Sequence, residues 1–183
     1  MLYHASQTPG IKILEPRISN HGKPLIYLSQ KRENVLVYLS NAVEKHCREN
    51  GFVHDGVYTK WGPYGFNGEG VLTLDEYYPN ATRETYAGVT GYIYSVSETG
   101  KPMEDIPFAF VTDKPVEVPE CEFVADAYAA LLQAAEQGKI IMNSYESSSP
   151  QKLKWIEKTV REEYENPNST AEYKYFLKYK FGL

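Results

Sequence analysis

The chain has 183 residues, of which 42% are hydrophobic and 23% charged, and its formal net charge is −5 with a pI near 5.4. A chain of this length can bury one substantial core, and this composition is too apolar for intrinsic disorder. The acidic balance argues against an extended nucleic-acid surface, because such binding depends on cations that neutralise phosphates. A local basic site or a small phosphorylated ligand stays open.

Two cysteines, Cys47 and Cys121, are too few for a disulfide framework, so we expect both to be small buried hydrophobes in a reduced compartment. The first residues show no basic segment followed by an apolar stretch, so we expect no signal peptide. No run approaches the ~18 apolar residues of a membrane span. We therefore predict a cytoplasmic protein that has no membrane partner.

The first half of the chain alternates short extended segments with one helical pattern. We predict strands at residues 2–5, 11–14 and 25–29, separated by Pro and Gly. Between residues 32 and 50 apolar side chains recur at spacings of three and four, which predicts one helix that Gly51 ends. Residues 52–90 are rich in Gly, Tyr and turn residues, and there we expect strands at 57–59, 71–74 and 84–86.

The second half begins with the clearest strand, at residues 91–96, followed by a turn at 99–102 and extended segments at 109–111 and 116–118. Helices are predicted at 122–137, where Gly138 suits the stop, and from Pro150 onwards. The last residues alternate like a strand, but Ser169 and Glu172 have capping-box spacing and Gly182 suits a helix end, so we favour a helix. The pattern predicts an α+β fold with a mixed, mostly antiparallel sheet, peripheral helices and a helical C-terminal appendage.

Three ring-bearing residues would make a good binding site if they converge on one cleft. His4 ends the first predicted strand, Tyr27 lies within the strand at 25–29, and Tyr38 follows on the predicted helix. Flat phenol rings can sandwich an aromatic heterocycle while an imidazole hydrogen-bonds a hydroxyl group. Each residue also has a structural interpretation, as a satisfied histidine near a strand end, a half-buried sheet tyrosine and a core tyrosine with its hydroxyl at the rim.

The order of these residues resembles the ADP-ribosyltransferase superfamily of the His-Tyr-Glu type. The similarity lies in Tyr-His-Ala-Ser at 3–6, Ile-Tyr-Leu-Ser at 26–29 and Tyr38. Gly-Tyr-Ile-Tyr-Ser-Val at 91–96, followed by Thr-Gly and then Glu-Asp-Ile-Pro at 104–107, is similar to the strand, turn and acidic loop of the bacterial rifampicin ADP-ribosyltransferases. The resemblance implies an ADP-ribosyltransferase-like domain at residues 1–142, whereas residues 143–183 would form the helical appendage.

The resemblance implies that NAD is the substrate cofactor, that its nicotinamide–ribose bond is cleaved, and that ADP-ribose passes to an acceptor that the sequence does not identify. Asp105, or alternatively Glu104, would be the catalytic carboxylate that stabilises an oxocarbenium-like state. His4 would hydrogen-bond the adenine-side ribose, and Tyr27 and Tyr38 would pack on the nicotinamide.

Ala5 and Ser29 complete the NAD-binding set that the resemblance implies. Ala5 follows His4 at the position where the family usually has a glycine whose backbone groups hold the nicotinamide amide. Two other hypotheses stay open: a non-catalytic nucleotide-binding or interaction module on the same fold, and a structural or accessory protein with no ligand. In the first, Ala5 or a misplaced acidic residue would have removed the catalytic activity. The structural interpretation of Glu104 and Asp105 is a solvated pair of loop charges.

Other candidate sites are weaker. The four histidines, His4, His21, His46 and His54, form no helical pair, and the chain has no Cys-x-x-Cys, so we expect no metal site. The aromatic residues of segment 61–70 fit a mobile lid or, as we favour, a hairpin connection whose rings pack on the sheet. Lysines interleaved with aromatic rings near the C-terminus fit a helix whose rings dock on the body while the lysines face water.

Overall fold

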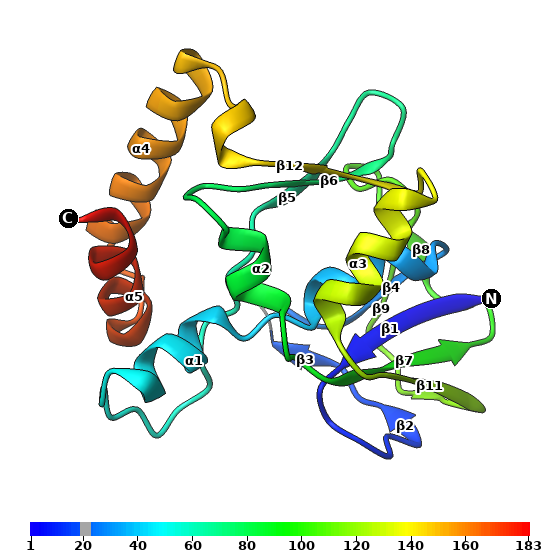
Figure 1. Cartoon of the computed structure of the whole chain (residues 1–183). Coiled ribbons are helices and arrows are strands. Elements are labelled where there is room, and N and C mark those ends of the chain that lie inside the picture. Colours follow the sequence, from blue (N-terminus) through cyan, green and yellow to red (C-terminus); the bar gives the residue numbers. More distant parts are fainter. Residues whose placement is uncertain (19–22) are drawn as a thin grey trace.

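The computed structural model describes residues 1–18 and 23–183, and His21 lies outside them. Within these residues the fold is α+β, with mostly antiparallel sheets and five α-helices (Figure 1). The large sheet has the order β11 (Glu120–Val124), β7 (Gly91–Val96), β1 (Leu2–Ser6), β4 (Pro24–Ser29), β9 (Ala109–Thr112) and β8 (Lys101–Pro102). A further strand, β3 (Arg17–Ile18), pairs with β4.

The first strand lies in the centre of the large sheet and contributes to two cores. It pairs with β7 along its whole length and with β4 at Tyr3 opposite Ser29. Leu2 packs with Ile26, Leu28 and other apolar side chains on one face, whereas Ala5 belongs to the core on the other. This alternation follows from the two-residue period of a strand.

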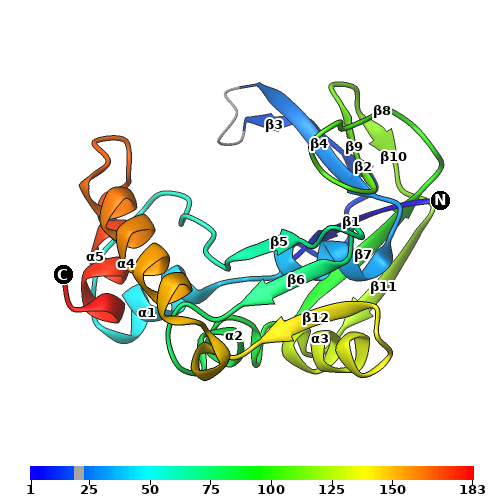
Figure 2. The same cartoon turned by 90° about the horizontal axis from the view of Figure 1, so that it is seen from above.

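Two smaller sheets complete the β structure. In the first, β12 (Ile140–Asn143) runs parallel to β6 (Leu72–Asp75), which pairs antiparallel with β5 (Tyr64–Phe66). The second joins β2 (Ile13–Leu14) to β10 (Val116–Glu117). Figure 2 shows that the three-stranded sheet faces the β4–β9 part of the large sheet. The central core lies among this sheet, the 3-10 helix η1 (Arg32–Tyr38) and helix α3 (Ala127–Glu136).

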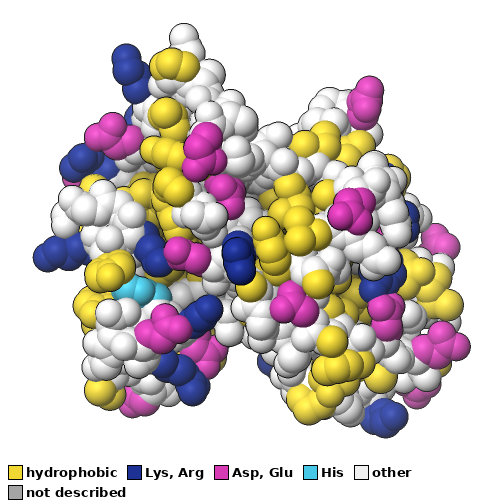
Figure 3. Space-filling view, in the orientation of Figure 1, with side chains coloured by type: hydrophobic (Ala, Val, Ile, Leu, Met, Phe, Trp, Pro, Cys, Tyr) yellow, Lys and Arg dark blue, Asp and Glu magenta, His cyan; other side chains and the backbone are white. Residues whose placement is uncertain are grey.

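Three helices gather on one side of the sheets around a second core. These are α1 (Ala42–Glu49), α4 (Pro150–Glu165) and α5 (Ala171–Phe181), and they pack around Trp61, Tyr78 and Phe176. Helix α2 (Ala81–Tyr86) lies between them and α3 (Figure 1). The surface shows deep notches between the helical part and the sheets (Figure 3). None of the helices in the described part of the chain has the length and hydrophobicity that crossing a membrane requires.

Several predicted elements are confirmed. The strand at 91–96 is β7, and the strand at 2–5 is β1 with one further residue. Pro150 occupies the first turn of α4, whose N-cap Ser149 accepts a hydrogen bond from the Lys152 amide at 3.2 Å. The chain ends in a helix, and Gly182 follows it with a φ of 68°, the left-handed conformation that glycine adopts most readily. The N-cap of this helix is Thr170 rather than Ser169.

The single helix predicted from 32 to 50 is wrong. The segment forms η1, a break at Leu39 to Asn41, and then α1. Leu39 packs into the central core, whereas Val43 packs into the helical core. Because one straight helix cannot direct these side chains into two separate cores, the chain changes direction between them.

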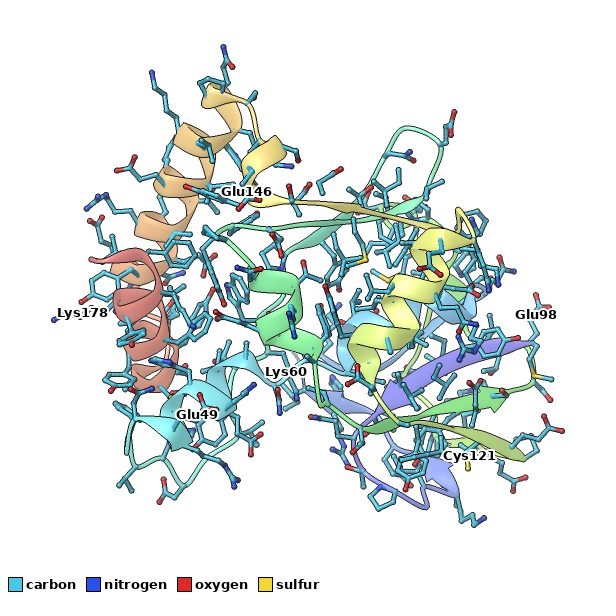
Figure 4. All side chains as sticks on the ribbon, viewed as in Figure 1. Glu49, Lys60, Glu98, Cys121, Glu146 and Lys178 are labelled. Atoms are coloured by element: carbon cyan, nitrogen blue, oxygen red, sulfur yellow. The ribbon has the colours of Figure 1, made fainter. Side chains whose placement is uncertain are left out.

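The helix predicted from 122 to 137 starts too early, because its first residues belong to the edge strand β11, which pairs with β7. The helix α3 begins after Asp126, whose carboxylate accepts a hydrogen bond from the Ala129 amide at 2.8 Å. Cys121 lies on β11 and is exposed, contrary to the prediction, because this strand borders solvent (Figure 4). Cys47 is buried, as predicted.

Two strands predicted in the Tyr-rich region are absent. Residues 57–59 form no strand, and the hydroxyl of Thr59 bonds to the Glu172 carboxylate of α5. Residues 84–86 belong to α2, where the Thr85 hydroxyl donates to the Ala81 carbonyl at 2.7 Å. Segment 61–70 does contain β5 and the turn of the β5–β6 hairpin, but Trp61 packs in the helical core instead of on the sheet.

Candidate functional site

His4 and Tyr27 lie on neighbouring strands of the large sheet and are in direct contact. The Nδ1 atom of His4 is 2.9 Å from the backbone carbonyl oxygen of Tyr27. A carbonyl oxygen can only accept a hydrogen bond, so Nδ1 carries the proton. In the neutral ring, Nε2 is then the hydrogen-bond acceptor.

Burial keeps the His4 ring neutral. It lowers the pKa of His4, and this effect outweighs the hydrogen bond to Tyr27, which acts to raise the pKa. The positive charge of Arg17 on β3 also acts to lower the pKa of His4. Since the pKa falls below the ordinary value of 6.5, the imidazole is neutral at pH 7. A neutral imidazole near a guanidinium suits a ligand that carries both hydroxyl and phosphate groups.

Three tyrosines from different elements come together beside these strands. The ring of Tyr38 at the end of η1 meets the ring of Tyr64 on β5 edge to face, with centroids 6.4 Å apart. Burial raises the pKa of Tyr38, and the nearby hydroxyls of Tyr64 and Tyr27 raise it further. Burial raises the pKa of Tyr64 as well, so Tyr38 and Tyr64 are neutral phenols at physiological pH. Through Tyr38, β4 of the large sheet and β5 of the three-stranded sheet come close together.

The side chains of Ala5 and Ser29 are buried. Ala5 pairs with Ile93 and its methyl group is buried in the central core. Ser29 is buried, and its hydroxyl accepts a hydrogen bond from the Lys31 amide at 3.1 Å, which shapes the turn after β4. Their backbones line β1 and β4, but their side chains face the protein interior.

Glu104 and Asp105 lie in the connection between β8 and β9, and both are exposed. This loop is anchored at the end of β4, where the Phe108 carbonyl accepts a hydrogen bond from the Gln30 amide at 2.9 Å. It also lies against the β5–β6 turn, because a Cβ atom built on Gly70 would be 3.2 Å from Pro107. The loop that carries the acidic residues is therefore held between the end of β4 and the β5–β6 turn.

The structure brings His4, Tyr27 and Tyr38 together, but it does not place the acidic residues beside them. Neither Glu104 nor Asp105 makes a hydrogen bond or ion pair with His4 or Tyr38. An enzyme built on this site would need the loop to bring a carboxylate inward when substrate binds.

Sequence reasoning did not identify Tyr64 and Arg17 as site residues. In the sequence, Tyr64 stands out only as one aromatic residue of a glycine-rich connection. Its contact with Tyr38 is not evident there, because the two residues are far apart along the chain. Arg17 lies on the short strand β3, which pairs with β4 at Leu25. A lone cation after a proline was the only signal for it in the sequence.

Within the described residues, which exclude His21, no group of three or more His, Cys, Asp or Glu side chains is arranged to hold a metal ion. His46 packs against Tyr175 and Tyr179 of α5, and His54 packs against Tyr58. These histidines thus lie in the helical part of the molecule, away from His4.

Comparison with known proteins assigns the chain to no family. The chain matches no protein-family model, no curated protein and no solved structure.

Proposed function

We propose that this chain is an ADP-ribosyltransferase-like enzyme that cleaves the nicotinamide–ribose bond of NAD and transfers ADP-ribose to an acceptor. The observation that carries the proposal is the hydrogen bond from His4 to the Tyr27 carbonyl. It joins the two strand-borne residues that the sequence resemblance marks as NAD-binding. It also leaves a neutral imidazole with Nε2 as an acceptor for a ribose hydroxyl.

The residues around this contact fit the parts of NAD. His4 would accept a hydrogen bond from the adenine-side ribose, and Tyr27 and Tyr38 would pack on the nicotinamide ring. The guanidinium of Arg17 is close enough to His4 to lower its pKa, and it would bind the pyrophosphate. Tyr64 would hold Tyr38 in position through their edge-to-face contact.

The reaction would break the bond between the ribose C1′ and the nicotinamide nitrogen, and nicotinamide would leave with the electron pair. The positive charge that develops on the ribose would be stabilised by a carboxylate, Asp105 in the preferred assignment or Glu104 in the alternative. A hydroxyl or amine of the acceptor, or water in its absence, would then attack C1′ and lose its proton to that carboxylate.

A direct test is to incubate the purified protein with NAD and measure nicotinamide release by chromatography, with and without cell lysate as a source of acceptor. The proposal predicts release in at least one of these conditions. If the protein at high concentration releases no more nicotinamide than a heat-denatured control, the proposal is contradicted.

A second candidate is a nucleotide-binding module without catalysis. The exposure of Glu104 and Asp105 favours it, because a carboxylate in water stabilises a distant positive charge weakly. Saturation-transfer NMR with NAD, ADP-ribose and AMP separates the two: binding without nicotinamide release supports the module. Neither binding nor release would leave a structural or accessory protein.

A further inference from the structure

The two borders of the large sheet differ in how well they are protected against further strand pairing. At one border, β8 is two residues long and contains Pro102, which has no backbone N–H to donate. At the other border, β11 is five residues long, contains no proline or glycine, and pairs with β7 at every position (Figure 1). Short strands, prolines and bulges protect a sheet edge, and β11 has none of these.

The outer side of β11 has unused backbone hydrogen-bonding groups. A strand that has a neighbour on one side only presents a row of unpaired N–H and C=O groups on the other side. Within the described part of the chain, the backbone of 120–124 makes no hydrogen bond to any element except β7. An extended peptide can therefore add a strand here and form a backbone ladder.

The apolar side chains of β11 are exposed on one face of the sheet. Cys121 and Phe123 share this face because successive side chains of a strand alternate. Phe123 is 57% exposed, and its ring packs beside the ring of Tyr92 on β7, with centroids 5.3 Å apart. Cys121 is exposed at the border of the sheet (Figure 4). An added strand would cover this surface with apolar residues of its own.

The other face of β11 is acidic. Glu120 and Glu122 share the face on which Val124 enters the central core. Glu122 forms an ion pair with Arg32 of η1, whereas Glu120 makes no ion pair with any described residue. From residue 120 to residue 123 the strand therefore alternates between acidic and apolar side chains. The complement of this pattern is a strand in which cations and apolar residues alternate.

The same charges disfavour a second copy of this chain as the partner. If two β11 strands paired antiparallel over their whole length, each Glu122 would lie opposite its own counterpart. Like charges directly opposite each other destabilise a strand pair. A basic partner strand replaces this repulsion with attraction.

We propose that β11 binds a partner protein by strand addition, and that the bound segment is an extended peptide in which Lys or Arg alternates with apolar residues. The backbone ladder supplies affinity, and the alternating side chains select the sequence and its register. Basic residues of the peptide face Glu120 and Glu122, and its apolar residues cover Cys121 and Phe123. This interaction uses none of the residues assigned to NAD and goes beyond the proposed function.

Three fluorescein-labelled hexapeptides test this surface by fluorescence polarisation. The first, Lys-Val-Lys-Val-Lys-Val, has the required alternation. The second, Lys-Lys-Lys-Val-Val-Val, has the same charge and composition in two blocks, and the third is the first peptide with N-methyl groups on its central amides. The proposal predicts that the alternating peptide binds about tenfold more tightly than either control. Equal affinity for the alternating and blocked peptides, unchanged affinity after N-methylation, or no saturable binding at millimolar concentration would overturn it.

Two charge reversals locate the contact. Glu120→Lys on β11 should weaken binding of the alternating peptide by about fivefold, because it places a cation opposite the basic residues of the peptide. Glu165→Lys makes the same change at an exposed position on α4 and should leave the affinity unchanged. Phe123→Ala removes the exposed ring and should weaken binding by about threefold. If Glu120→Lys binds as well as wild type, or if both reversals weaken binding equally, the proposed site is wrong.

Hydrogen exchange of the backbone amides tests the mode of binding. The outward amides of 120–124 should exchange rapidly in the free protein and about tenfold more slowly with saturating alternating peptide. Binding without slower exchange in this strand would contradict strand addition. Slow exchange in the absence of peptide, together with a dimer in analytical ultracentrifugation, would assign the edge to a second copy of the chain and overturn the proposal as well.

Discussion

The hydroxyl of Thr59 donates a hydrogen bond of 3.1 Å to the carboxylate of Glu172, although 113 positions separate the two residues. Glu172 is 1% exposed, and the same oxygen also accepts from the Thr170 hydroxyl. A buried carboxylate is tolerated only when hydrogen bonds replace its hydration. This contact therefore fixes α5 to the segment that leads into β5.

Replacing Glu172 by glutamine should destabilise the protein by about 1–3 kcal/mol, because an amide cannot accept all the hydrogen bonds that the carboxylate accepts. Urea unfolding followed by circular dichroism measures the change. The exposed Glu165→Gln variant is the control and should stay within about 0.5 kcal/mol of wild type. Equal free energies of unfolding for the two variants would mean that the buried carboxylate of Glu172 contributes nothing to stability.

The same group predicts how stability depends on pH. Burial acts to raise the pKa of Glu172, but hydrogen bonds from Thr170, its own amide and Thr59 outweigh it and hold the pKa below 4.5. A carboxylate with a lowered folded-state pKa contributes its full stabilisation above the unfolded value, and this is lost as pH falls through the folded-state pKa. The free energy of unfolding should therefore fall below pH 4.5, and it should fall less steeply in Glu172→Gln than in wild type.

Gly100→Ala should destabilise the fold by about 2–4 kcal/mol. Gly100 has a φ of 78°, and a Cβ atom there would be 2.4 Å from the Val111 carbonyl oxygen, so both the backbone and the contact are unfavourable. Gly68→Ala is the matched change, because a Cβ atom at Gly68 meets nothing within 4 Å. The melting temperatures of the two variants test this prediction. Similar melting temperatures would argue against a tight turn at Gly100.

NAD affinity should depend on Arg17 and on the neutral form of His4. Arg17→Ala should weaken NAD binding about tenfold, as expected for one charge-assisted contact to phosphate, whereas Lys23→Ala should not. Because the pKa of His4 lies below 6.5, affinity should be constant from pH 7 to 8 and decline only below pH 6.5 as the ring gains a proton. Calorimetric titration with NAD across this pH range measures both effects. If the affinity for NAD already declines above pH 7, a neutral His4 imidazole is excluded.

The carboxylate assignment is tested by single substitutions in the acidic loop. Asp105→Asn should reduce nicotinamide release by about 100-fold or more if it stabilises the developing charge, and Glu104→Gln should do so if the alternative is right. Glu98→Gln, an exposed acid in the preceding connection (Figure 4), should have wild-type activity. Full activity in both loop variants would remove this loop from the proposed mechanism.

Strands β1, β4 and β7 of the large sheet and the C-terminal helices were predictable because local signals agreed with the final structure. The alternation around Tyr27 and the run at 91–96 have the period of a strand, and Pro150 and Gly182 mark helix ends by their own backbone preferences. The order of short motifs singled out His4 and Tyr27 as members of one binding site, but not the hydrogen bond from the His4 ring to the Tyr27 carbonyl.

The remaining features depend on contacts between distant residues. The division between η1 and α1 is set by two cores that Leu39 and Val43 enter separately, and no local pattern reveals two cores. The contact of Tyr38 with Tyr64 requires β5 to pack against η1. The exposure of Cys121 follows from the edge position of β11, which depends on the strand order of the whole sheet.

The central position of β1 has a consequence for synthesis on the ribosome. Its longest pairing is with β7, whose residues follow it by about ninety positions, so the first strand leaves the exit tunnel long before its partner exists. Pairings between such distant segments are slow to form, because a long loop must close first. The strand β1, apolar at Leu2 and Ala5, therefore stays without its β7 partner for several seconds at ordinary elongation rates of about 5–20 residues per second. During that interval it is a natural target for a chaperone.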